Sequence, residues 1–232
     1  MARTSKKPRK RTGPSGEQSI GTSKASTRDR VLYEASRLFA HRGYYGTSTH
    51  AIAEAVGIRQ PSLFHHFASK QEIMRALLSH DLDQPARRAS ELAEANGSPS
   101  ARLYCYIRAD TAHLAASPYN LIGLHRDEVL REPEFRAERR TEEQIYAAIH
   151  RLISEGVEAR ELRDVDRHLA QELIVGLNDN TMRLASMPNA LSPLEMAEFV
   201  ADFALRGLLI DPGELDRVRA EAAELQLKLP LF

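Results

Sequence analysis

Residues 47–70 read Thr-Ser-Thr-His-Ala-Ile-Ala-Glu-Ala-Val-Gly-Ile-Arg-Gln-Pro-Ser-Leu-Phe-His-His-Phe-Ala-Ser-Lys, and this stretch decides the fold. The pattern predicts two short helices joined by a tight turn. A side-chain oxygen of Thr47 or Ser48 can cap the first helix. Gly57 ends that helix, because a residue with positive φ costs least when it is glycine. Pro61 marks the beginning of the second helix, where its missing N–H group has no partner to lose.

The second short helix has one face for the protein and one face for a partner. Leu63 and Phe67 are four residues apart, so both side chains are expected to point toward the core. The opposite face would carry Arg59, Gln60, Ser62, His65 and His66. An ordinary polar surface accounts for each of these residues singly, but not for all of them together on one short helix. The combination is typical of a recognition helix that enters the major groove of DNA.

The flanking residues complete a three-helix unit. A first helix is expected over residues 27–41, and Ser69 and Glu72 have the capping-box spacing that opens a longer helix. With these flanks, the chain resembles the tetracycline-repressor (TetR) family of bacterial transcription regulators over about residues 27–75. The residues that match at the family's spacing are Gly43, Thr47, Ile52, Ala53, Gly57, Leu63, Phe64, His66, Phe67 and Lys70.

Two positions depart from the family pattern. The residue before Gln60 is often a small capping serine in the family, and here it is Arg59. The residue at Phe64 is often a tyrosine whose hydroxyl group contacts a phosphate, a hydrogen bond that Phe64 cannot make. Neither departure alters the predicted fold, but both bear on the individual DNA contacts.

The resemblance implies an all-α protein with a helix-turn-helix DNA-binding domain followed by a larger helical domain. We expect a disordered basic arm at residues 1–26, the DNA-binding domain at 27–72, and an effector-binding and dimerisation domain at 73–232. The family further implies a cytoplasmic homodimer that binds a double-stranded, palindromic operator. It implies neither enzymatic activity, nor a cofactor, nor a membrane. Repression, relieved by a small-molecule effector, is the mode of regulation that the resemblance favours.

The charge of the chain is segregated, although it sums to zero. Residues 1–26 carry a net charge of +6, residues 27–70 carry +3 and residues 71–232 carry −9. A basic end beside a candidate recognition helix indicates a polyanionic partner there, although a solubilising tail is the alternative for residues 1–26. The single Cys105 excludes an intramolecular disulfide and is expected to be a buried structural thiol. No apolar run approaches the roughly 18 residues of a membrane span.

The candidate DNA contacts divide by the chemistry they offer. Gln60 can donate to and accept from adenine in bidentate fashion, and Arg59 can donate to guanine. Lys70, at the beginning of the following helix, is expected to reach a phosphate as a point charge. The full set is Ser48, Thr49, His50, Arg59, Gln60, Pro61, Ser62, Phe64, His65, His66 and Lys70.

The remaining chain reads as helices separated by Pro, Gly and Ser. They are expected over residues 70–95, 100–116, 119–131, 135–156, 165–187 and 193–209, with a loop from residue 156 to 164 and a last short helix after residue 211. The helix at 193–209 has two apolar stripes. One stripe can face the core, while the other needs a partner, which a second copy of the chain would supply. The residues expected at this dimer interface are Leu173, Leu177, Met196, Phe199, Val200, Phe203 and Gly207. A helix buried on all sides within one chain is the alternative.

Polar residues among apolar ones mark a candidate effector cavity. Asn178 stands out, because asparagine is a poor helix former and its neighbours Leu177 and Met182 are apolar. A ligand or an ordered water would account for it, and positions at the dimer interface or in solvent are the alternatives. The candidate effector-binding residues are Tyr104, Thr111, His125, Tyr146 and Asn178.

Two other functions compete with an effector-controlled regulator. An architectural DNA-binding protein without an effector would use its basic arm as the main functional part. A helical enzyme could use His125 and Glu128 as an acid–base pair, but no nucleophile motif or phosphate loop in the sequence supports it. The same pair alone offers too few ligands for a metal ion, so no metal site is expected.

Overall fold

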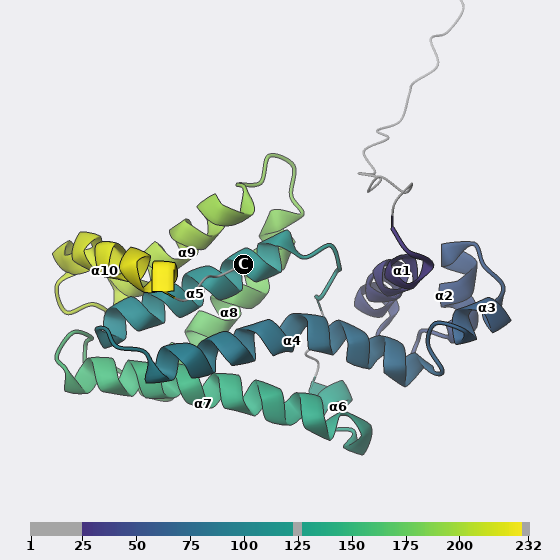
Figure 1. Ribbon diagram of the computed structural model, residues 1–232, viewed down its shortest axis with the longest axis horizontal. Helices are drawn as coiled ribbons and strands as arrows, with labels where there is room; N and C mark the ends of the chain where they lie inside the picture. The colour runs from purple at the N-terminus through teal and green to yellow at the C-terminus, as the bar shows by residue number, and fades with distance from the viewer. Residues whose placement is uncertain (1–24, 123–126, 229–232) are drawn as a thin grey trace, which may run out of the picture.

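The computed structural model describes residues 25–122 and 127–228, and these residues are built into helices. A small unit of three helices, α1 to α3, lies at one end, and longer helices form the rest of the molecule (Figure 1). Helix α4, Lys70–Glu94, begins in the small unit and continues into the larger one. The boundary expected after residue 72 therefore falls within one continuous helix. The expected basic arm lies, up to residue 24, outside the described residues.

Helix α1, Thr27–Arg42, forms where the sequence predicts it. Ser26 and Asp29 make a reciprocal capping box at its beginning, which satisfies backbone N–H groups that have no partner inside the helix. Val31, Ala35 and Phe39 are buried at helical spacing, so this face anchors the small unit.

Helix α5, Pro99–Ala116, is the centre of the larger unit. It packs against α4, α7 (Arg136–Glu158), α8 (Arg167–Ala185), α9 (Pro193–Leu208) and α10 (Leu215–Lys228). Every residue from Ala101 to Ile107 is buried, and a helix without an exposed side must be covered all round. Arg102 is accommodated there because it donates to Glu155 at 2.5 Å and to the carbonyl oxygen of Ala93 at 3.2 Å.

Cys105 lies in this central helix. Its side chain is buried, and Sγ lies 3.3 Å from the carbonyl oxygen of Ala222. Burial raises the pKa of the Cys105 thiol to about 12, so the reactive thiolate is suppressed. The prediction of a structural thiol is confirmed. Separately, no helix in the described part of the chain has the length and apolar character needed to cross a membrane.

The helix predicted over residues 119–131 is largely wrong. Residues 119–122 are not helical, residues 123–126 lie outside the described part, and α6 covers only Asp127–Leu130. The backbone N–H of Asn120 donates to Ser36 Oγ in α1 at 3.0 Å, and the Asn120 side chain accepts from the N–H of Ile122 at 3.2 Å. These bonds hold the beginning of the segment in a turn. A short 3-10 helix, η1, follows at Pro133–Phe135 and leads directly into α7.

The loop predicted to begin at Gly156 also begins later. Helix α7 continues to Glu158, and Arg160 then turns the chain with a positive φ of 57°. A Cβ atom at position 156 would lie 2.5 Å from Leu162 Cδ1. Glycine is therefore present for close packing against Leu162, and its presence does not end the helix. After α9, a 3-10 helix η2, Pro212–Glu214, introduces α10.

Candidate DNA-binding surface and effector cavity

The two short helices predicted from residues 47–70 are present. Helix α2, Thr49–Val56, is capped by Ser48, whose Oγ accepts from the N–H of Ala51 at 3.1 Å. Gly57 ends it in the left-handed region with φ 76° and ψ 34°. Helix α3, Gln60–Phe64, follows with Pro61 in its first turn. Arg59 occupies the cap position without a side-chain bond, as expected from the missing serine.

One face of α3 is fixed to the protein and the other is exposed. Leu63 is fully buried and Phe67 is 3% exposed, so both side chains anchor the helix against the small unit. Helix α3 lies at the outer end of this unit (Figure 1). The predicted DNA contacts that are exposed are Ser48, His50, Arg59, Pro61, Ser62, Phe64, His65 and His66. Thr49, Gln60 and Lys70 are partly buried.

Thr49 and Gln60 are joined across the turn. Gln60 Nε2 donates to Thr49 Oγ1 at 2.9 Å, which links the first residue of α3 to the first residue of α2. Thr49 and Gln60 were each predicted to contact DNA on their own. The hydrogen bond between them could not be predicted from the sequence.

Lys70, which was predicted to reach a phosphate as a point charge, has partners within the chain. Its Nζ donates to the carbonyl oxygens of Tyr44 at 2.8 Å and Thr47 at 2.9 Å, and lies 4.3 Å from the centroid of the Tyr44 ring. Burial lowers the pKa of Lys70 from its ordinary value. Lys70 therefore ties the beginning of α4 to the loop between α1 and α2. Thr47 supports the same loop, because its Oγ1 donates to the carbonyl oxygen of Gly43 at 2.9 Å.

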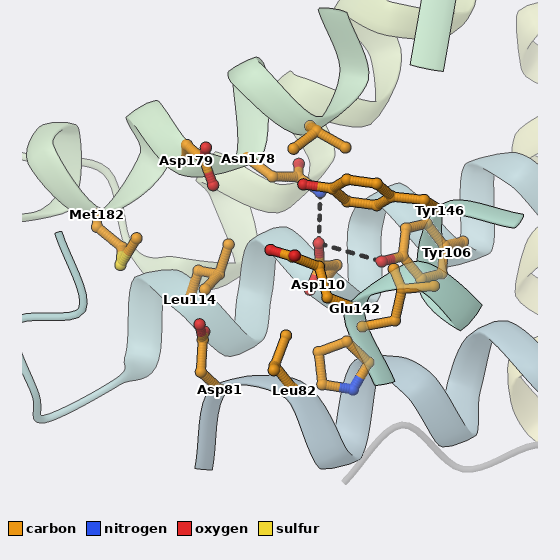
Figure 2. Close-up of a pocket in the computed structure, with 13 residues that line it drawn as sticks. Asp81, Leu82, Tyr106, Asp110, Leu114, Glu142, Tyr146, Asn178, Asp179 and Met182 are labelled. Carbon is orange, nitrogen blue, oxygen red and sulfur yellow. Dashed lines mark hydrogen bonds between the residues drawn. The ribbon is translucent and has the colours of Figure 1, made fainter. Parts of the chain in front are cut away.

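A cavity of about 50 Å³ lies in the larger unit, between α4, α5, α7 and α8. Figure 2 shows Asp110 near its centre, with Asn178 and Tyr106 directed toward it. Two predicted effector residues, Tyr146 and Asn178, line the cavity. Its other lining residues are Asp81, Leu82, Pro85, Tyr106, Asp110, Leu114, Glu142, Ile145, Val175, Asp179 and Met182. The lining thus combines aliphatic side chains with four carboxylates and two tyrosines.

Asn178 has partners within the chain. Its Oδ1 accepts from Thr111 Oγ1 at 2.9 Å, and its Nδ2 donates to Asp110 Oδ2 at 2.5 Å. Side chains of the chain itself therefore satisfy the amide of Asn178, for which the sequence suggested a ligand or an ordered water. The partners lie on α5, which is more than sixty residues away in sequence. Thr111, another predicted effector residue, is fully buried behind Asn178 and does not line the cavity.

The surroundings of Asp110 in the cavity shift the pKa of its carboxyl group. Burial, followed by the repulsion of Asp81, raises the pKa of Asp110 to about 7, although the hydrogen bond from Asn178 opposes this shift. Tyr106 also donates to Asp110 at a long 3.4 Å. Near neutral pH the carboxyl group of Asp110 can therefore exist in either protonation state. Asp110 was not among the residues predicted from the sequence, although an acid within the mostly apolar stretch of residues 103–114 was a visible signal.

Tyr104, like Thr111, does not line the cavity. Tyr104 lies on another side of α5, where its hydroxyl donates to Asp202 Oδ1 at 3.1 Å, and Arg219 also donates to Asp202. Burial, assisted by the charge of Asp202, raises the pKa of Tyr104 to about 12. His125 lies outside the described residues, and the side chain of Glu128 does too.

The small unit is joined to the end of the larger one through aromatic and polar contacts. The Tyr44 ring packs edge-on against Phe135, with ring centroids 5.8 Å apart. Tyr45 donates to Glu132 Oε1 at 2.5 Å, and Arg75 pairs with Glu138 at 3.1 Å. The two tyrosine contacts connect the loop before α2 to the segment that leads into α7, and the ion pair joins α4 to the first turn of α7. The next turns of α7 line the cavity.

Helices α8 and α9 pack against each other and expose large apolar side chains. The exposed fractions are 62% for Leu173, 64% for Phe199 and 61% for Phe203. Gly207 is also exposed, and Leu177 is partly buried. Met196 and Val200, which were predicted at the dimer interface, are instead only 5% and 6% exposed within the single chain. They lie with Ala197, Ala201 and Leu205 on the inner side of α9, while Leu194 is 48% exposed.

Comparison with protein families gives two matches along the chain. Residues 31–77 match the model of bacterial regulatory proteins of the tetR family. Residues 96–208 match the model of the tetracyclin repressor-like C-terminal domain. The first match covers most of the small helical unit, and the second covers most of the larger unit, including the cavity residues on α5, α7 and α8.

Individual proteins agree with these matches. The transcriptional repressor KstR2 of Mycobacterium tuberculosis is 38% identical over 78 residues, which are 34% of this chain and 39% of that repressor. The match with this curated relative thus spans about two fifths of its length. The crystal structure of Mycobacterium smegmatis AmtR is 30% identical, with a TM-score of 0.74 over 87% of this chain and 95% of that one. AibR, solved in complex with isovaleryl coenzyme A and operator DNA, is 21% identical with a TM-score of 0.60, over 81% of this chain and 99% of that one. The likeness to AibR is one of fold alone.

Proposed function

The chain belongs to the TetR family of bacterial regulatory proteins, and we propose that it is a transcriptional repressor that leaves its operator when a small molecule binds. The observation that carries the proposal is the exposed face of α3. Arg59, Ser62, His65 and His66 project from a short helix whose other side is held by the buried Leu63. Such a helix presents hydrogen-bond donors and positive charge to the edges of bases and to phosphates. We place this function in the cytoplasm, where the operator would be found, and assign no enzymatic role.

The functional form is a homodimer in this proposal. The exposed side chains Leu173, Phe199 and Phe203 form an apolar face on α8 and α9, and a second copy of the same face would remove it from water. Two copies related by a two-fold axis would also present two α3 helices, which is what a palindromic operator requires. Met196 and Val200 support this face from behind, within each chain.

The effector would bind in the cavity between α4, α5, α7 and α8. Its lining offers aliphatic contacts from Leu82, Leu114 and Val175, and hydrogen-bonding groups from Asp110 and Tyr146. Apolar walls with convergent polar groups are typical of a small-molecule site, and this lining adds four carboxylates to its apolar walls. The cavity is small in this structure, so a ligand larger than a few atoms requires that the surrounding helices move apart.

That movement would reach the DNA-binding unit through α7. The same helix contributes Glu142 and Tyr146 to the cavity and begins beside Phe135, which contacts Tyr44. A ligand that pushes α7 therefore acts on the loop before α2 and changes the spacing of the two α3 helices in the dimer. Such control requires unequal affinity of the ligand for the two arrangements, and about 1–3 kcal/mol is typical of this coupling.

DNA selection from a random-sequence library tests the first part of the proposal. The purified dimer should enrich a palindromic sequence, and Gln60→Ala should weaken binding to that sequence by about 1–3 kcal/mol while changing binding to random DNA little. Failure of the wild-type protein to enrich any sequence would remove the proposed function.

A metabolite screen for operator release tests the second part and separates it from the alternative of an architectural protein. A compound that releases operator DNA from the wild-type protein should fail with Val175→Phe, which fills the cavity, while the variant still binds the operator. If no compound releases DNA and the cavity-filling variant behaves as the wild type in all respects, an effector-independent DNA-binding protein is the better assignment.

A further inference from the structure

The geometry between α2 and α3 points to an indirect role for Thr49. Gln60 Nε2 donates to Thr49 Oγ1 at 2.9 Å, and the two residues are eleven apart in sequence. Each is the first residue of its helix, and the cap bond of Ser48 at one end and the left-handed Gly57 at the other fix the position of α2. The acceptor is therefore held by the fold, whereas a glutamine side chain alone would sample many rotamers.

The bond divides the hydrogen-bonding groups of Gln60 in a defined way. A glutamine amide has two N–H donors and one carbonyl oxygen. Thr49 takes one of the donors, so one N–H and the carbonyl oxygen remain for a partner. In the major groove, adenine presents an acceptor at N7 beside a donor at N6, which is the complement of the remaining pair. Guanine presents two acceptors, N7 and O6, and would require both N–H groups of the amide.

We propose that Thr49 is a positioning residue that makes Gln60 selective for adenine over guanine at one operator position. Thr49 acts through the side-chain amide of Gln60 and makes no base contact in this role. The inference rests on the proposed function, because it concerns how the same α3 helix reads DNA. The inference assigns adenine as the base that Gln60 reads, whereas the residue type of Gln60 alone leaves adenine and guanine open.

The hydroxyl group of Thr49 can also donate a hydrogen bond, and the reversed bond would give the opposite base preference. If Thr49 Oγ1 donated to the Gln60 carbonyl oxygen, the amide would be turned around and both N–H groups would face the DNA. That arrangement would select guanine. The base found at the Gln60 position therefore reports the direction of the bond, which the heavy-atom positions of an amide do not distinguish.

The test uses the full-length dimer and selection from a random DNA library. The operator position read by Gln60 is the one whose base preference disappears in Gln60→Ala. At that position the wild-type protein should prefer adenine over guanine by roughly 5- to 150-fold, the range of a good bidentate contact. Thr49→Val, which keeps the shape but removes the acceptor, should reduce this preference several-fold. Thr49→Ser, which keeps the hydroxyl group, should restore it.

Two further measurements separate positioning from other roles. In the double variant of Thr49→Val and Gln60→Ala, the affinity for the selected operator should be no lower than in Gln60→Ala alone, because Thr49 acts only through Gln60. Thr141→Val on α7, where the threonine hydroxyl likewise donates within a helix, serves as the matched control and should leave base preference unchanged.

Three results would overturn the inference. The first is a guanine preference in the wild type, and the second is full retention of the adenine preference in Thr49→Val. The third is an equal loss of affinity for all DNA sequences in Thr49→Val, which would make Thr49 a phosphate contact. In each of these cases the protein still selects an operator and the proposed function stands. Absence of any selected sequence, by contrast, overturns the proposed function and this inference with it.

Discussion

The ring of Phe135 packs edge-on against the ring of Tyr44, with the ring planes 82° apart. Phe135 is fully buried and immediately precedes α7, while Tyr44 lies in the loop between α1 and α2. Seven positions after Phe135, Glu142 lines the cavity. The contact therefore connects the DNA-binding unit to the beginning of the helix that lines the proposed effector cavity.

Replacement of this contact should loosen the loop before α2. We expect Phe135→Leu, which keeps an apolar side chain but loses the ring contact, to lower the free energy of unfolding by about 1–2 kcal/mol. Backbone amides at residues 43–47 should exchange hydrogen faster, whereas those of α10 should not change. Uniformly faster exchange in both regions would indicate a general loss of stability and no special link between α7 and the loop.

Lys70 provides a second test of how this loop is held. Lys70→Met keeps the aliphatic length but leaves the carbonyl oxygens of Tyr44 and Thr47 without their donor. We expect a loss of about 1–3 kcal/mol in the free energy of unfolding, measured by urea denaturation, because unsatisfied and partly buried carbonyl groups are costly. Lys70→Arg should lose less. Unchanged stability, together with a salt dependence of DNA binding flattened by about one unit of slope, would restore Lys70 to the phosphate contacts.

Asp110 should make stability depend on pH in a direction opposite to that of an ordinary paired carboxylate. Its pKa is about 7 in the folded chain, above the ordinary value of 3.8 for an aspartate, so the folded state binds the proton more tightly than the unfolded state. Stability from this group is present below about pH 4 and is lost as pH rises to about 7, a fall on the order of 1–4 kcal/mol.

Asp110→Asn should remove that fall and make unfolding curves at pH 5 and pH 8 more alike. Asparagine can still accept from Asn178 through its own oxygen, so the fold should be retained. Asp83→Asn on the exposed side of α4 is the matched control and should preserve the wild-type pH dependence. An identical pH dependence in Asp110→Asn and the wild type would mean that Asp110 titrates normally.

Neighbouring residues on α9 distinguish the dimer interface from the core of one chain. Phe199 is 64% exposed, so Phe199→Asp should give a folded, soluble monomer by light scattering and circular dichroism. Val200 is 6% exposed, so Val200→Asp should instead bury a charge within the chain and cost several kcal/mol of stability. A dimer that persists in Phe199→Asp would exclude this face as the interface.

The sequence predicts the helix-turn-helix unit well because its signals are local. Gly57, Pro61 and the pair Leu63 and Phe67 each act within a few residues, and the structure confirms all of them. The partners of Lys70 and Asn178 could not be predicted in the same way. Lys70 donates to residues 26 and 23 positions earlier, and Asn178 binds Asp110 across 68 positions.

Periodicity also could not decide which apolar stripe of α9 faces outward. Met196 and Phe199 both read as bulky apolar residues, and only the position of α5 determines that Met196 is covered. The segment after residue 118 was misread for a related reason. Its apolar residues suit a helix, but the bond from Asn120 to Ser36 in α1 holds its backbone in a turn.

If the exposed apolar side chains of α8 and α9 form the dimer interface, they also link the degree of repression to the cellular concentration of the protein. If only the paired form fits a palindromic operator, then at low abundance the concentration of binding-competent protein rises as the square of the total chain concentration. Repression would then respond steeply to a modest change in synthesis. Single chains below this threshold would expose Leu173, Phe199 and Phe203 to water, which makes them targets for chaperones and proteases and lowers the unpaired population further.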